Sequence, residues 1–121
     1  MNWTLDKSRP ICPQICEQIC VAIANGVFSV GEKLLSVREV ALHAGVNPNT
    51  VQKSFEELER LGVIHSVRCS GWYVSENVEA AKAQVNTLRA QKTEDYLRSM
   101  KQLGCSPEEI IQYVIKQGGM V

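Results

Sequence analysis

The chain has 121 residues, of which 45% are hydrophobic and 21% are charged. This length suffices for one modest hydrophobic core and leaves little room for a second large domain. Thirteen basic and thirteen acidic residues give a formal net charge of zero, which excludes a surface that is basic throughout. No stretch has the roughly 18 apolar residues of a membrane span, and the N-terminus lacks the basic and apolar regions of a signal peptide. We therefore expect a cytoplasmic protein that does not enter a membrane.

The first predicted helix covers residues 11–25, because isoleucine recurs there every four residues and forms one apolar stripe. These residues are Ile11, Ile15, Ile19 and Ile23. The helix starts near Pro10 or Pro13, since proline is tolerated only in a first turn, and it ends at Gly26.

Three of the five cysteines form a second stripe on this helix, about 100° from the isoleucines. They are Cys12, Cys16 and Cys20. Clustered cysteines in a reducing compartment often serve metal or redox chemistry, so metal or thiol sensing is one interpretation. We favour the other, in which small, readily buried residues flank the apolar stripe. Thiols that climb a helix at about 6 Å per step do not easily converge on one ion, and we predict no metal or cofactor site.

A second, shorter helix is predicted after the turn that Gly31 ends. Ser36 and Glu39 have the S-x-x-E spacing of a capping box, in which each side chain bonds the backbone N–H of the other residue. The expected apolar face consists of Val37, Val40, Ala41 and Ala44.

A third helix is predicted from Pro48. Asn47 can cap this helix, and proline is tolerated at the first helical position because the N–H that it lacks would have no partner there. Only residues 44–46, Ala-Gly-Val, separate it from the second helix. Such a tight connection is typical of a helix-turn-helix. Its buried face is expected to contain Val51, Phe55 and Leu58, with Leu61 as a further candidate.

The first turns of this third helix carry hydrogen-bonding side chains near the end opposite the apolar face. They are Asn49, Thr50, Gln52 and Lys53. Asn and Gln can bond adenine edges, Thr can contact a thymine methyl or a phosphate, and Lys neutralises a phosphate. These residue types suit a helix that enters a DNA groove, although solvated helix ends have similar compositions.

A small β-hairpin is predicted after Gly62, which ends the third helix. Residues 63–67 and 72–74 are β-prone, and Arg68-Cys69-Ser70-Gly71 separates them.

With GEKLLSVREVA, then VNPNTVQKSFEELERLGVI and a hairpin ending in GWYV, the chain resembles the GntR family of bacterial transcription regulators over roughly residues 9–75. The resemblance implies a mainly α, winged helix-turn-helix fold in which the helix from Pro48 reads the major groove and the hairpin reaches the minor groove or backbone. By position, it implies DNA contacts from Arg38, the third helix and the wing glycine. Two departures are Leu34-Leu35-Ser36 in place of the family's usual Leu-Pro-Ser, and a wing with fewer basic residues. The candidate DNA-binding residues are Lys33, Ser36, Arg38, Asn47, Asn49, Thr50, Gln52, Lys53, Arg68, Ser70 and Gly71.

Two helices are predicted beyond the hairpin. The first covers residues 75–103 with Ala81, Val85, Leu88, Tyr96, Met100 and Leu103 near one side. After Gly104, Ser106-Pro107-Glu108-Glu109 caps a second helix, whose expected buried face is Ile110, Ile111, Val114 and Ile115. This apolar surface exceeds what a small core can cover, which favours homodimerisation over packing on the same chain. The short helical tail resembles the YtrA subfamily, so we expect a DNA-binding domain over residues 1–75 and a dimerisation tail over residues 76–121.

These features predict a sequence-specific transcription regulator, most simply a repressor. As a homodimer it would bind a palindromic operator in double-stranded DNA, with two reading helices one turn, ~34 Å, apart. The alternatives are a winged-helix module for protein–protein interaction and a metal- or thiol-responsive regulator. An enzyme is not expected, because His43 and His65 have no Ser, Cys or carboxylate at a diagnostic spacing. No residue pattern indicates the effector.

Overall fold

The structure, a computed structural model, describes residues 1–118 of the chain. It is divided into two compact units, Met1–Asn86 and a second unit that begins at Thr87. The boundary lies within the longest helix, α4 (Glu79–Gln102). No helix formed by residues 1–118 is long and apolar enough to cross a membrane.

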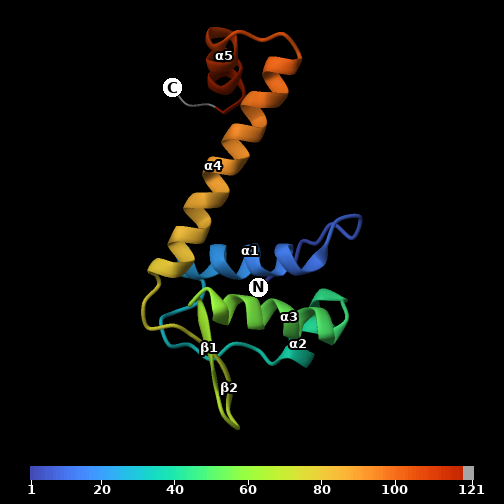
Figure 1. Cartoon of the computed structure of the whole chain (residues 1–121), viewed down its shortest axis with the longest axis vertical. Coiled ribbons are helices and arrows are strands. Elements are labelled where there is room, and N and C mark those ends of the chain that lie inside the picture. The colour runs from blue at the N-terminus through green and yellow to red at the C-terminus, as the bar shows by residue number, and fades with distance from the viewer. Residues whose placement is uncertain (119–121) are drawn as a thin grey trace. The chain divides into compact units, whose positions relative to one another are not determined.

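The first unit is the predicted winged helix-turn-helix, and its elements are shown in Figure 1. They are α1 (Ile11–Ala24), α2 (Val37–Ala44), α3 (Pro48–Arg60), β1 (Ile64–Val67), β2 (Gly71–Val74) and the first turns of α4. Helix α3 packs against both α1 and α2, and its predicted apolar face is buried, with Val51, Phe55 and Leu58 at most 1% exposed. The same core takes in Ile15, Ile19 and Ile23 of α1, as the four-residue spacing predicts.

The predicted helix signals are confirmed at atomic detail. Pro10 is the N-cap of α1, and Pro13 lies in its first turn. The capping box at α2 is complete, with Ser36 Oγ accepting from Glu39 N and Glu39 Oε1 accepting from Ser36 N, both at 3.1 Å. Gly45 ends α2 with φ +68°, a left-handed conformation that residues with a Cβ rarely adopt.

The wing is a two-stranded antiparallel hairpin in which Ile64 pairs with Val74 and Val67 pairs with Gly71. Lys33 forms an isolated bridge to Tyr73 on the outer side of β2, and Leu34 N donates to the Trp72 carbonyl at 2.8 Å. The segment before α2 therefore holds the wing, a pairing that the sequence pattern did not indicate.

The N-terminal segment, residues 1–9, is bound to α1 by the side-chain amides of two glutamines. The Gln14 amide accepts from Asp6 N at 2.7 Å and donates to the Asp6 carbonyl at 2.8 Å. Gln18 makes the same pair of bonds with Thr4, at 3.2 and 2.6 Å. Trp3 and Leu5 pack against the core, so this segment, to which the sequence analysis assigned no structure, is part of the domain.

The predicted start of α4 at residue 75 is wrong, because α4 begins at Glu79. Asn77 Oδ1 accepts from Glu79 N at 2.9 Å and caps the helix there. Ser75 instead donates its hydroxyl to the Gly62 carbonyl at 2.8 Å, which holds the preceding residues in a connecting segment.

The second unit contains the rest of α4 and α5 (Pro107–Gly118). The predicted capping box is present, because Ser106 and Glu109 exchange bonds at 3.0 and 3.2 Å. The predicted buried face of α5 needs correction within the single chain. Ile110 is buried, but Ile111 and Val114 are 56% and 37% exposed, since the described part of this unit is too small to cover more than one side of the helix.

Candidate nucleic-acid interface

The N-terminal end of α3 presents polar side chains, as its sequence predicts. Asn47 Oδ1 accepts from Asn49 N at 2.8 Å, so the Asn47 side chain positions the helix start. Asn49 and Lys53 are exposed, whereas Thr50 and Gln52 are half-buried. Two of the four predicted contact residues are thus directly available to a partner.

Gln52 is already engaged in the free protein. Its Nε2 donates to Glu56 Oε1, one turn further along α3, at 3.0 Å. An adenine edge needs one N–H and the carbonyl oxygen of a glutamine amide, and the second Nε2 hydrogen of Gln52 can serve for this while the bond to Glu56 persists.

Arg38 and the start of α3 meet at one surface groove. The groove is lined by Arg38, Ala41, Leu42 and the segment from Gly45 to Pro48. Arg38 is exposed at the first turn of α2, and Leu42 is 81% exposed on the same helix. Ser36 Oγ accepts from Glu39 N in the capping box, which holds the first turn of α2, the turn that carries Arg38.

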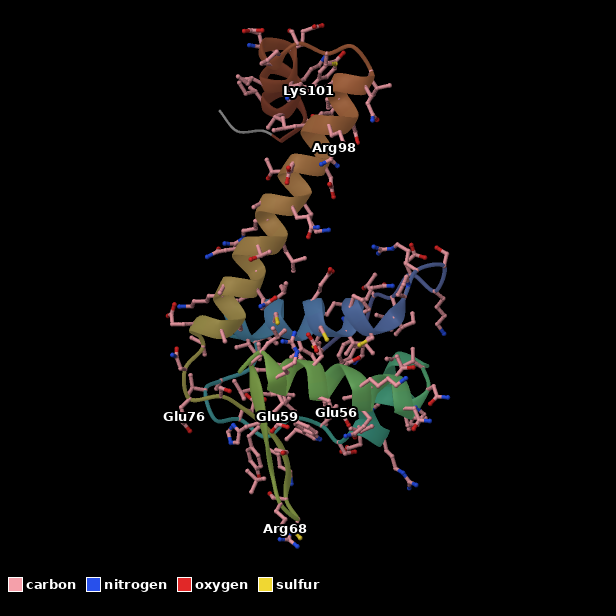
Figure 2. The ribbon with its side chains drawn as sticks, in the orientation of Figure 1. Glu56, Glu59, Arg68, Glu76, Arg98 and Lys101 are labelled. Carbon is pink, nitrogen blue, oxygen red and sulfur yellow. The ribbon has the colours of Figure 1, made fainter. Side chains whose placement is uncertain are left out.

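Lys33 and Gly71 are neighbours at the wing. Gly71 has φ +136°, and a Cβ built there would lie 3.2 Å from Lys33 Cε, so both its conformation and its surroundings favour glycine. Arg68 projects at the tip of the hairpin (Figure 2). The next residue, Cys69, has φ +63°, which is uncommon for a residue with a side chain. The Ser70 hydroxyl forms a hydrogen bond with the Tyr73 hydroxyl.

The basic residues that are predicted to bind DNA differ from three other arginines of the chain in whether they form ion pairs with carboxylates. Within residues 1–118, Lys33, Arg38, Lys53 and Arg68 have no carboxylate within 4.0 Å, whereas Arg9 and Arg60 each have one and Arg98 has two. These four cations can therefore bind phosphate without first breaking an ion pair.

Acidic side chains also occur along α3. Glu59 Oε2 accepts from the Ser66 backbone N at 2.8 Å and from its hydroxyl at 2.9 Å, which ties α3 to β1. Glu57 is hydrogen-bonded and ion-paired to Arg60, which lowers the pKa of Glu57. Glu56 and Glu59 are labelled along α3 in Figure 2.

In the cysteine stripe of α1, Cys20 is buried, and Cys12 and Cys16 are half-buried. Burial raises the pKa of Cys16 to about 12 and that of Cys20 to about 11. Cys16 Sγ donates to the Ser54 carbonyl of α3 at 3.4 Å. Protonated thiols are poor nucleophiles and poor metal ligands. In the part of the chain that the structure describes, no group of three His, Cys, Asp or Glu side chains is arranged to hold a metal ion.

The sequence analysis missed an aromatic contact within the wing. His65 stacks on Tyr73 across the hairpin, with ring centroids 6.0 Å apart. The two residues are directly opposite each other in the paired strands. Two aromatic residues at paired positions of a predicted hairpin are the sequence signal from which this contact could have been expected.

Residues 13–74 match the family described as "Bacterial regulatory proteins, gntR family". The chain is 35% identical over 112 residues to the "Uncharacterized HTH-type transcriptional regulator YhcF" of Bacillus subtilis, and the match covers 93% of both proteins. It is 46% identical over 73 residues to the "HTH-type transcriptional repressor YtrA" of Bacillus subtilis, covering 60% of this chain and 56% of YtrA.

Solved structures show the same similarity. A GntR family transcriptional regulator from Listeria monocytogenes matches with a TM-score of 0.83 and 39% identity, covering 93% of this chain and 98% of that protein. AraR(DBD) in complex with operator ORX1 matches with a TM-score of 0.54 and 25% identity, covering 62% of this chain and 92% of AraR(DBD). The winged helix-turn-helix is thus similar to one that was solved with its operator.

Proposed function

Because the chain belongs to the gntR family of bacterial regulatory proteins, we propose that it represses transcription by binding a palindromic operator as a homodimer. Residues 1–75 bind the DNA in this proposal, and residues 76–121 hold the two subunits together. We also place the protein in the cytoplasm, where a chromosomal operator would lie. The repressor role is supported by the similarity to YtrA, whose name describes it as a repressor.

One observation carries the proposal: a polar helix start lies beside cations that, among residues 1–118, have no carboxylate within 4.0 Å. Asn49 and Lys53 are exposed on α3, and the groove at the helix-turn-helix corner joins Arg38 to Asn47. A surface for protein binding would be expected to expose apolar anchors at such a helix start. Leu42 is an exposed apolar residue of this groove, whereas the polar side chains of the helix start itself match the donors and acceptors of base edges and phosphates.

Each predicted residue has a distinct role in this proposal. Base edges are read by Asn49, Thr50 and Gln52. Phosphates are bound by Lys33, Arg38, Lys53, Arg68 and Ser70. Ser36 and Asn47 position α2 and α3, and Gly71 allows Lys33 to lie close to the wing.

The homodimer is supported by apolar side chains that the second unit leaves exposed. Leu103, Ile111 and Tyr113 are 79%, 56% and 48% exposed. Exposure of several large apolar residues in a small helical unit marks a surface for another protein. A second copy of the chain fits best, because two copies of the DNA-binding domain match the two halves of a palindrome.

The test is a selection of operator fragments from genomic DNA with the purified full chain, repeated at two salt concentrations. The proposal predicts one enriched palindrome whose affinity falls steeply with salt, since phosphate contacts release counterions. The enriched fragment then enters an in vitro transcription assay with RNA polymerase, where added protein should reduce the transcript. Absence of any enriched sequence would favour a protein-interaction module, and an increased transcript would contradict repression.

A further inference from the structure

The first unit contains a cavity of about 300 Å³ beneath the N-terminal segment. Its walls come from that segment, α1, the loop before α2, and one side of both α2 and α3. The apolar lining includes Trp3, Ile19, Phe28, Leu34, Val40 and Phe55. Three of these are aromatic, so the cavity suits a flat apolar molecule.

The polar lining places a cation at this cavity. Lys33 lines it and, among the described residues, has no carboxylate within ion-pair distance. Glu32 also lines it, but Glu32 Oε1 accepts from Ser29 N at 2.9 Å, which directs that oxygen to its own loop. Glu32 keeps its charge and its second oxygen, and His43 also lines the cavity, so the group that can pair with a ligand carboxylate is the Lys33 ammonium.

The same lysine connects the cavity to the wing. The backbone of Lys33 pairs with Tyr73, and its Cε lies 3.2 Å from the position of a Cβ at Gly71. In the proposed function this ammonium binds a phosphate. A carboxylate in the cavity would compete with DNA for it.

The N-terminal segment connects the cavity to the turn between α2 and α3. Its Trp3 lines the cavity, and Lys7 Nζ donates to the Gly45 carbonyl at 3.0 Å. Gly45 is the turn between α2 and α3, so the segment that lines the cavity also contacts the helix-turn-helix corner.

We propose that this cavity binds a small aromatic carboxylic acid, with its ring between Trp3 and Phe55 and its carboxylate on Lys33, and that binding weakens the hold on DNA. The binding site itself does not depend on the proposed function, but the regulatory effect rests on it. Reciprocity requires that operator DNA weakens the acid by the same factor by which the acid weakens DNA.

Titration calorimetry of the full chain with 2-naphthoate, and separately with neutral 2-naphthol, tests the site without DNA. We expect saturable binding of 2-naphthoate, about fivefold or more tighter than that of 2-naphthol, because only the acid pairs with Lys33. Trp3→Ala should weaken 2-naphthoate about tenfold, since it removes an aromatic wall. Val27→Ala is the matched control, because Val27 is 62% exposed and lies outside the lining.

Nuclear magnetic resonance of the unmodified chain keeps the test decisive if Trp3→Ala does not fold. The indole N–H signal of Trp3 should shift on adding 2-naphthoate, more than that of Trp72, which does not line the cavity. No saturable binding, equal affinity for 2-naphthol, or an unmoved Trp3 signal would each overturn the proposal. A failed operator selection with intact 2-naphthoate binding would instead count against the proposed function alone.

Once the operator has been identified, the regulatory effect of 2-naphthoate can be measured directly. DNA affinity is titrated with and without saturating 2-naphthoate, and 2-naphthoate affinity with and without DNA. Equal weakening in both titrations supports the coupling. Unchanged DNA affinity would overturn it.

Discussion

The ring of Trp72 in the wing meets Phe55 of α3 edge-on, with centroids 5.5 Å apart and an interplanar angle of 77°. Phe55 is 1% exposed, so this contact anchors the hairpin to the interior of the domain. In the proposed complex it sets the position of the wing relative to the helix that reads the bases.

Trp72→Ala should lower the free energy of unfolding by about 2 kcal/mol, because it removes a half-buried ring and its edge-on contact. Denaturation in urea followed by circular dichroism measures this loss. Trp72→Phe keeps an aromatic ring and should retain most of the stability. An unchanged midpoint in Trp72→Ala would mean that the wing is not anchored by this contact.

Arg38→Ala should weaken binding to the selected operator about tenfold to hundredfold without unfolding the protein, since Arg38 is exposed and its side chain is not part of the core. Fluorescence anisotropy with labelled operator checks this. Arg9→Ala is the matched control, because Arg9 is exposed but paired with Asp6 at 3.1 Å. Equal affinity of the Arg38 and Arg9 variants would remove Arg38 from the interface.

Glu56→Gln should strengthen DNA binding about two- to fivefold at low salt, because it removes a negative charge beside the proposed DNA-contacting residue Gln52 yet keeps an acceptor for it. The gain should shrink as salt rises. Glu108→Gln in α5 removes an exposed charge far from α3 in the chain and serves as the control. A gain of the same size in both variants would show a general charge effect rather than a local one.

The boundaries of α2 and α3 could be predicted because their signals are local. Ser36 and Glu39 are three residues apart, Asn47 caps the residue two positions on, and Gly45 supplies a left-handed turn. Such interactions form within a few residues, so spacing and residue type are sufficient evidence.

The unpredicted features depend on residues distant in sequence. Lys33 pairs with Tyr73, and Gln14 binds the backbone of Asp6 across eight residues. Apolar periodicity carries no information about such bonds. The exposure of Ile111 was missed for another reason, since its spacing predicts an apolar face but not whether the same chain covers it.

The candidate site shows the same division. The polar contact residues at the start of α3 were predicted from the sequence and from the family resemblance. The hydrogen bond between Gln52 and Glu56 was not predicted. This bond spans four residues in a helix, a spacing at which polar side chains interact, so this signal was available.

The cysteines should differ strongly in reactivity. Cys69 is exposed at the wing tip, whereas Cys16 and Cys20 have pKa values raised to about 12 and about 11 by burial. At neutral pH iodoacetamide should modify Cys69 well before these two, as peptide mass spectrometry of timed samples would show. Rapid modification of Cys16 or Cys20 in the folded protein would revive thiol sensing by this stripe.

Burial of these thiols also sets the direction of a pH effect. In the unfolded chain they lose protons near the ordinary pKa of 9.0, while the folded protein holds them to higher pH. Their contribution to stability is therefore complete below about pH 9 and is lost as the pH rises through the folded values. Urea midpoints measured from pH 8 to 11 should fall more in the wild type than in Cys20→Ala.

Ile111→Glu combined with Val114→Glu should convert the proposed dimer to a monomer, because both side chains are exposed in the single chain and a charge at the proposed subunit contact would be costly. Sedimentation velocity measures the state directly. Gln112→Glu is the control, since it adds a charge to the same helix at an exposed polar position.

The double variant should also lose affinity for the full palindrome while keeping its weaker affinity for a half-site, because each subunit retains its own DNA-binding residues. A double variant that stays dimeric would place the subunit contact elsewhere, and a wild-type chain that sediments as a monomer would remove the dimer from the proposal.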